Sequence, residues 1–256
     1  MNKRLALITG VGRKEGIGAA ICKQLAADGM DILFTYWHAY DREVMQHERS
    51  EDPEKIREAC RAFGVRAEII ELNLADPRSI EELYAYSMTV FGRYPDTLVH
   101  NAAVSINDSI ETITADGLDR HYEINTRAVT LLTQTFLKHF DYEYGRIICI
   151  TTGWEVGPMP DELSYVLTKS TMDTLAFTLA PRLAAKKITI NCINPGPTDT
   201  GWMNEELKKV LLERSPQGRL GRPEDAAKLA GILASEQSQW ITGQTIHSEG
   251  GFINHF

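Results

Sequence analysis

The sequence predicts an α/β fold, a doubly wound parallel sheet with helices on both faces, in a single domain of residues 1–256. Short apolar runs alternate with amphipathic segments along the whole chain. Several of these runs lack polar alternation, as strands buried on both faces of a parallel sheet do. The chain is also long enough to bury a substantial core. The runs are residues 5–8, 32–35, 67–72, 98–100, 146–151, 188–193 and 245–247.

The segments between the runs have the spacing of amphipathic helices. Ile17, Ile21 and Leu25 recur every four residues and form one apolar stripe. Asp-Pro pairs at 52–53 and 76–77 look like helix N-caps followed by proline at the first helical position. Two further stripes predict helices, one of Leu118, Tyr122, Val129, Leu132 and Phe136 and one of Met172, Leu175 and Leu179.

Composition excludes several classes of protein. The 27 Lys and Arg residues against 35 Asp and Glu give a formal charge of -8, which argues against a nucleic-acid binder. The four cysteines form no CxxC pair and the histidines show no HExxH spacing, so we expect no metal. No run is long enough to span a membrane, and we expect a soluble, cytoplasmic protein.

A glycine-rich segment follows the first apolar run directly. Residues 9–18 read TGVGRKEGIG. At a strand-to-helix turn such glycines allow a tight backbone and the close approach of a pyrophosphate, and the N-terminus of the next helix offers free N–H groups. The segment predicts a dinucleotide site, with a merely structural turn as the alternative.

The end of the second run bears on the choice of dinucleotide. An acidic residue usually stands there when the ribose 2′-hydroxyl is bound, but this run ends in Thr35 and Tyr36 with no carboxylate. Arg13 and Lys14 in the glycine-rich segment suit a 2′-phosphate instead. We expect NADP(H), with NAD(H) as the alternative. The charged region 37–51 is expected to be a solvated loop, or else part of the rim of the cofactor site.

A tyrosine and a lysine stand four residues apart at the start of a predicted helix. Tyr165 and Lys169 would share one helix face, where an ammonium beside a phenol favours the phenolate. The phenol could protonate a carbonyl oxygen as hydride arrives, or deprotonate an alcohol in the reverse direction. Thr152 ends a predicted strand nearby, at the sheet edge where ligands bind. Asn125 falls on a buried stripe and is either a satisfied structural amide or a functional one.

These features together resemble the short-chain dehydrogenase/reductase family over nearly the whole chain, including its 3-oxoacyl-[acyl-carrier-protein] reductase-like members. Residues 9–18 are similar to the family's cofactor loop, and residues 100–103, HNAA, to its NNAG segment. Residues 194–200, NPGPTDT, resemble its NPGxxxT segment at the nicotinamide amide. Residues 218–225 and 241–251 resemble its C-terminal signatures.

The resemblance implies roles for individual residues. Tyr165 would be the general acid/base, and Lys169 would bind the nicotinamide ribose and lower the pKa of the phenol. Thr152 would contact the substrate oxygen, and Asn125 would hold a water that links Lys169 to solvent. The cofactor would contact Gly10, Arg13, Lys14, Gly16, Ile17, Gly18, Tyr36, Asn73, Leu74, Asn101, Ala102, Tyr165, Lys169, Pro195, Gly196, Thr198 and Thr200.

The sequence departs from the family pattern in four places. Five residues separate Gly10 from Gly16, where the pattern has three. Thr152 stands in place of the usual serine, and its methyl group takes space and stiffens χ1. Residues 100 and 103 replace the first Asn and the Gly of NNAG, and Asn73 replaces the Asp at the adenine. We expect reduced but real catalysis.

The resemblance implies a Rossmann-like sheet of about seven strands and a homotetramer or homodimer. The expected function is NADP(H)-dependent hydride transfer between the nicotinamide and a carbonyl or secondary alcohol. An NAD-dependent alcohol dehydrogenase and a non-catalytic redox sensor are the alternatives. A 3-oxoacyl thioester, a steroid-like ketone, a sugar and a quinone all stay open as substrates. Residues 201–216 are expected to form an amphipathic lid through Trp202, Met203, Leu207, Val210 and Leu211.

Overall fold

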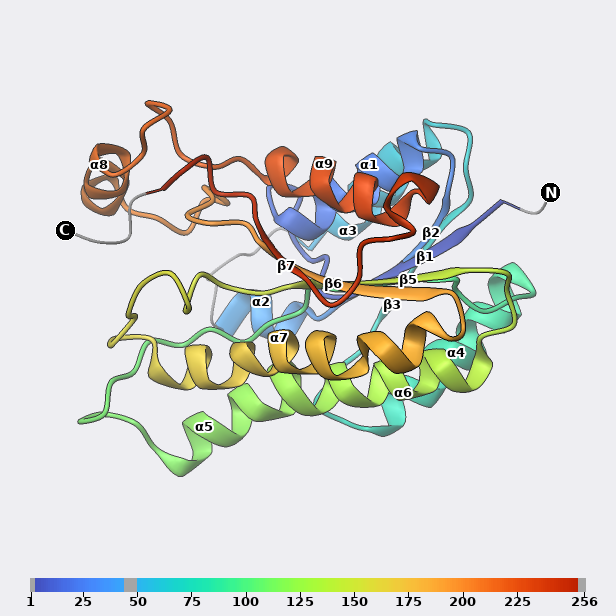
Figure 1. Cartoon of the computed structure of the whole chain (residues 1–256), viewed down its shortest axis with the longest axis horizontal. Helices are drawn as coiled ribbons and strands as arrows, with labels where there is room; N and C mark the ends of the chain where they lie inside the picture. The colour runs from blue at the N-terminus through green and yellow to red at the C-terminus, as the bar shows by residue number, and fades with distance from the viewer. Residues whose placement is uncertain (1–2, 44–49, 253–256) are drawn as a thin grey trace.

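The computed structural model describes residues 3–43 and 50–252, and within them it confirms the doubly wound α/β fold. The seven strands are parallel and run in the order β3-β2-β1-β4-β5-β6-β7, so the chain starts in the middle of the sheet and winds out to both edges (Figure 1). They are β1 (Leu5–Ile8), β2 (Asp31–Tyr36), β3 (Ala67–Glu71), β4 (Thr97–His100), β5 (Gly145–Ile150), β6 (Ile188–Asn194) and β7 (Thr245–His247).

Helices cover both faces of the sheet (Figure 1). One layer holds α1 (Ile17–Ala27), α3 (Asp52–Arg61) and α9 (Pro223–Ala234). The other holds α4 (Arg78–Phe91), α6 (Val129–His139) and α7 (Leu163–Ala184), with α5 (Ala115–Tyr122) leading into α6 through the π-helical segment η1 (Glu123–Ala128). The remaining elements are α2 (His38–Glu43), α8 (Glu205–Glu213) and the short 3-10 turn η2 (Glu236–Ser238).

Each central strand is buried on both sides, which explains its apolar run. In β1, Ala6 and Ile8 pack with the α1 layer while Leu5 and Leu7 pack with the α7 layer. All four side chains are fully buried. This alternation joins the two helix layers into one body around a single sheet.

Three sequence expectations need correction. Region 37–51 is expected to be a solvated loop or else part of the rim of the cofactor site, and its described part includes α2 where a loop is expected; residues 44–49 lie outside the described residues. The stripe from Leu118 to Phe136 is one rod interrupted by the π-helical turn η1. Asp52 and Asp76 are not the N-caps, because α3 begins at Asp52 itself and α4 has Pro77 as its N-cap residue.

The amino-terminal edge of the sheet is held by a buried carboxylate. Asp96, just before β4, accepts hydrogen bonds from the Leu5 amide (2.8 Å) and the Arg4 guanidinium (2.8 Å). The Thr97 hydroxyl donates to it as well (2.9 Å). Asp96 therefore fixes the start of β1 against the start of β4, at the edge opposite the carboxyl ends of the strands.

We expect Asp96→Ala to lower the free energy of unfolding by about 3 kcal/mol, because it leaves the buried Leu5 amide without its acceptor and removes the carboxylate that pairs with the Arg4 guanidinium. Urea unfolding measures this change. Asp28→Ala, which removes an exposed carboxylate, is the control and should change stability by less than about 0.5 kcal/mol. Equal stability of the two variants would contradict this role of Asp96.

Candidate active site

A cleft of about 1880 Å³ opens at the carboxyl ends of the parallel strands. That edge is where ligands bind in doubly wound folds. All the residues expected in the site line this cleft except Lys14 and Asn125. The volume exceeds that of ordinary small-molecule pockets and suits a dinucleotide together with a substrate.

The glycine-rich segment is shaped by its contact with the chain that follows β4. Gly10 has a φ of +72°, and a Cβ there would lie 2.5 Å from the Ala102 Cα. A Cβ on Gly18 would lie 2.6 Å from the Asn101 amide nitrogen. That amide donates to the carbonyls of Thr9 (2.8 Å) and Gly10 (2.9 Å). The two segments thus form one rigid wall, and α1 begins there without a side-chain cap on its free N–H groups.

The longer loop rests on α2 and α3. A Cβ on Gly12 would lie 1.9 Å from the Asp41 carboxylate, so Gly12 makes room for α2. The Arg13 guanidinium lies 3.8 Å from the same carboxylate, and the Lys14 amide donates to Asp52 (3.2 Å). The Lys14 ammonium pairs with Glu15 (3.6 Å), and of these two residues only Glu15 lines the cleft. Of the two cations expected at a 2′-phosphate, only Arg13 lines the cleft.

Sequence reasoning missed that Asp41 lies in this part of the cleft. Asp41 stands five positions beyond the end of β2, and only the α2 turn brings it back over the loop. The neighbouring Tyr40 also reaches into the cleft, where its hydroxyl accepts from the Ser105 amide (3.2 Å). The charge of region 37–51 was the only signal in the sequence. That signal did not predict α2, the helix that orients the Asp41 side chain.

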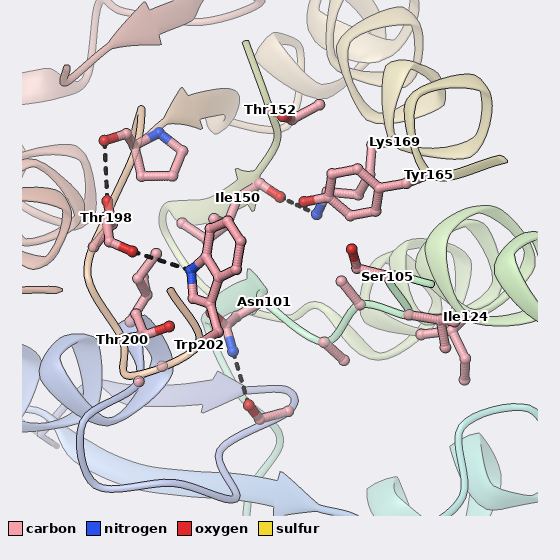
Figure 2. A pocket seen from close by; sticks show the side chains of 18 of the residues that line it. Asn101, Ser105, Ile124, Ile150, Thr152, Tyr165, Lys169, Thr198, Thr200 and Trp202 are labelled. Atoms are coloured by element: carbon pink, nitrogen blue, oxygen red, sulfur yellow. Dashed lines mark hydrogen bonds between the residues drawn. The ribbon is translucent and has the colours of Figure 1, made fainter. Parts of the chain in front are cut away.

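The tyrosine and lysine lie on one face of α7, as their spacing predicted (Figure 2). The Lys169 ammonium donates to the Ile150 carbonyl at the end of β5 and lies 5.9 Å from the centroid of the Tyr165 ring. Asp108 holds the start of α7, because its carboxylate accepts from the Ser164 amide (2.8 Å) and from the Ser164 hydroxyl. Tyr165 and Lys169 are thereby held in place by the anchored start of α7 and by the hydrogen bond to β5.

The electrostatics differ from the expectation of an acidified phenol. Burial raises the pKa of Tyr165, and the nearby Glu162 and Tyr40 add to the rise, while the interaction with the Thr152 hydroxyl opposes it. Burial also lowers the pKa of Lys169 to about 8. In this cleft the chain's own groups therefore keep the phenol protonated at neutral pH, and they do not make it more acidic.

The Thr152 hydroxyl faces the phenol from the end of β5 and donates to the Met159 sulfur (3.7 Å). Asn125 lies outside the cleft and is fully buried. Its amide oxygen accepts from the Val104 amide (2.9 Å), and its amide nitrogen donates to the Val104 carbonyl (2.9 Å) and the Thr168 hydroxyl (3.0 Å). These hydrogen bonds join the Asn125 side chain of η1 to α7 and to the segment after β4.

The segment after β6 closes one side of the cleft. The Trp202 indole donates to the Thr198 carbonyl (3.3 Å), and Figure 2 shows its ring between Thr198 and Asn101. Leu207 and Leu211 of α8 also line the cleft. Of the other apolar residues expected in a lid, Met203 is buried and Val210 is exposed.

Within residues 3–43 and 50–252, no group of three or more His, Cys, Asp or Glu side chains is placed to hold a metal ion. In the same ranges, no helix has the length and apolar character needed to cross a membrane. All four cysteines are buried and free.

The fold and the cleft place the chain among the α/β enzymes that work at the carboxyl edge of a doubly wound sheet. A family model described as Enoyl-(Acyl carrier protein) reductase matches residues 10–253. The uncharacterized oxidoreductase YjdA of Bacillus subtilis is 39% identical over 254 residues, which is 98% of this chain and 97% of that protein.

Solved structures agree with these matches. A short-chain dehydrogenase/reductase from Serratia marcescens superposes with a TM-score of 0.84 at 30% identity, covering 97% of this chain and 98% of that one. The landomycin C-6 ketoreductase LanV with bound NADP and rabelomycin has a TM-score of 0.84 at 28% identity, covering 97% and 95%. The chain belongs to the short-chain dehydrogenase/reductase family and is an oxidoreductase acting on carbonyl or CH–OH groups.

The buried ammonium should cost stability at neutral pH. Unfolded lysine titrates near 10.4, and the folded pKa of Lys169 is about 8, so the unfolded chain binds more protons between these values and stability rises with pH across that window. We expect Lys169→Met to stabilise the protein by about 2 kcal/mol at pH 7, with a smaller gain at pH 10.

Urea unfolding at the two pH values measures this difference. The exposed Lys186→Met is the matched control, with no pH-dependent gain expected. A Lys169→Met protein less stable than the parent at pH 7 would show that the bond to Ile150 outweighs the desolvation of the ammonium.

Proposed function

We propose that this enzyme is an NADP(H)-dependent reductase that transfers a hydride between the nicotinamide and a carbonyl or secondary alcohol, with Tyr165 as general acid/base. One observation carries the proposal: the Tyr165 phenol, the Thr152 hydroxyl and the Lys169 ammonium line the same cleft as the glycine-rich segment. The glycine-rich segment would bind the dinucleotide, and Tyr165 at the edge of the sheet would donate the proton.

The residues of the cleft fit a dinucleotide. Gly10 and Gly18 have no Cβ, so the glycine-rich segment packs closely against the chain that follows β4 to form one wall. The N-terminus of α1 has no side-chain cap and suits a pyrophosphate. Arg13 is the cation on this wall and suits a 2′-phosphate, and the related LanV structure contains NADP. The dinucleotide would supply the hydride. Gly196 and Thr198 after β6 would face its nicotinamide end, and Asn73 and Leu74 its adenine end.

The proton chemistry favours reduction over oxidation. Because burial raises its pKa, the Tyr165 phenol is protonated at neutral pH and ready to donate to a carbonyl oxygen. The Thr152 hydroxyl lies beside the phenol and would hold the same oxygen. Lys169, with a pKa of about 8, is mostly an ammonium at pH 7 and would stabilise the phenolate left behind.

We further propose a single domain over residues 1–256 and a cytoplasmic homotetramer or homodimer. One sheet carries both core layers, which supports one domain. The four free buried cysteines suit a reducing compartment. The exposed Tyr122 and Leu167, on the helices next to the site, suit an interface between copies.

We expect Tyr165→Phe to lower kcat for NADPH-dependent ketone reduction by about a thousandfold, because it removes the proton donor and leaves the ring in place. The decrease in NADPH absorbance with a panel of ketones measures kcat. Thr152→Val should reduce kcat less, since it removes a supporting hydroxyl only. Turnover by Tyr165→Phe at the parent rate would end the proposed mechanism.

We expect Arg13→Ala to weaken NADPH binding by about tenfold and NADH binding by less than about twofold, because the guanidinium is assigned to the 2′-phosphate. Cofactor fluorescence titrations measure both constants. Lys14→Ala is the matched control: it removes a cation one position along that lies outside the cleft. Equal losses for the two cofactors, or tighter binding of NADH by the parent, would contradict the assignment.

A further inference from the structure

A third polar residue continues the line of Tyr165 and Lys169 along α7. Asp173 stands one helical turn beyond Lys169, and the four-residue spacing puts all three side chains on one face. Asp173 does not line the large cleft. It lines a smaller neighbouring cavity of about 520 Å³ on the far side of the segment after β5, together with Glu155, Val156, Phe177, Gly243, Thr245 and His247.

Three hydrogen bonds converge on the Asp173 carboxylate. One oxygen accepts from the Thr151 hydroxyl (2.7 Å) and from the Trp154 indole (2.9 Å). The other oxygen accepts from the Thr245 hydroxyl of β7 (2.7 Å). Hydrogen bonds to an ionised acceptor are among the stronger ones in proteins. A single side chain thus ties α7 to β7 and to the segment that follows β5.

These contacts lie on either side of the candidate catalytic hydroxyl. Thr151 precedes Thr152, and Trp154 follows it by two residues. One turn back on the helix, Lys169 binds the carbonyl of Ile150. The chain from Ile150 to Trp154 is therefore attached to α7 at two successive turns, and this attachment sets where the Thr152 hydroxyl meets Tyr165.

We propose that Asp173 is a positioning residue that fixes the Thr152 loop against the catalytic helix and serves as the counter-charge of Lys169. The proposal rests on the proposed function, because it assigns Asp173 a part in the same proton transfer. Asp173 acts through Thr151, Trp154 and Lys169 and does not itself touch the reacting atoms.

The charges around Lys169 single out Asp173. Cys149 of β5, Cys192 of β6 and Asp173 act to raise the pKa of Lys169 against the dominant effect of burial. A hydrogen bond with Cys149, together with burial, keeps the Cys192 thiol protonated by raising its pKa. Burial lowers the pKa of His100, on β4, to about 3, so His100 is neutral as well. Asp173 is the carboxylate in this group.

The direction of the effect follows from the sign of the charge. Removing the carboxylate lowers the pKa of Lys169 further, so the ammonium is lost at a lower pH. Because the ammonium is needed beside the phenolate, the alkaline fall in kcat for reduction should move to lower pH. The proton donor itself, Tyr165, is unchanged by this substitution.

The test compares Asp173→Asn with two matched variants in the full-length enzyme. We expect Asp173→Asn to lower kcat at pH 7 by about tenfold and to move the alkaline limb of the kcat profile down by about one pH unit, with the Kd for NADPH within about twofold. Thr245→Val removes one hydrogen bond but keeps the charge, so its alkaline limb should stay in place. Thr174→Ala, on the exposed face of α7, should match the parent.

The possible outcomes separate this proposal from the proposed function. An alkaline limb of Asp173→Asn that coincides with the parent's, or one that moves equally in Thr245→Val, overturns the counter-charge role. If Asp173→Asn does not fold, Thr151→Val and Trp154→Phe test positioning, and parent values of kcat in both overturn it. An inactive Tyr165→Phe alongside an unaltered Asp173→Asn leaves the proposed function standing and removes Asp173 from it.

Discussion

The burial of one ammonium group is the constraint on which the site depends. Lys169 is enclosed between α7 and the ends of β5 and β6, where desolvation lowers its pKa to about 8. Its ammonium donates a hydrogen bond to the Ile150 carbonyl. Cys149, Cys192 and Asp173 act to raise its pKa against the effect of burial. The Ile150 carbonyl lies at the end of β5, which is paired with β4 on one side and with β6 on the other. The position of the ammonium therefore depends on the pairing of the sheet.

Much of the fold could be predicted from the sequence, because burial on both faces gives a parallel strand an apolar run that is readable without coordinates. The runs around Leu7 and Ile190 became β1 and β6. The helix boundaries near Asp52 and Asp76 were less certain, since a proline fits either of the first helical positions. The π-helical turn at Asn125 left no periodic signal at all, because it adds one residue to an otherwise regular stripe.

The candidate site was predictable where neighbours along the chain determine it, and unpredictable where distant segments meet. Tyr165 and Lys169 share a face because four residues make about one helical turn. The partners of the Asn125 side chain, Val104 and Thr168, come from distant segments, and the sequence does not indicate that these segments meet. Likewise, the pKa of Tyr165 depends on how Tyr40 and Glu162 pack around it, and residue spacing contains no information about that enclosure.

The contact between Gly12 and Asp41 links two positions that are 29 residues apart in the chain. A side chain at position 12 would meet the Asp41 carboxylate, so a larger residue there requires that carboxylate to turn away. The same carboxylate lies 3.8 Å from the Arg13 guanidinium, so the substitution would also change the surroundings of the cation in the loop.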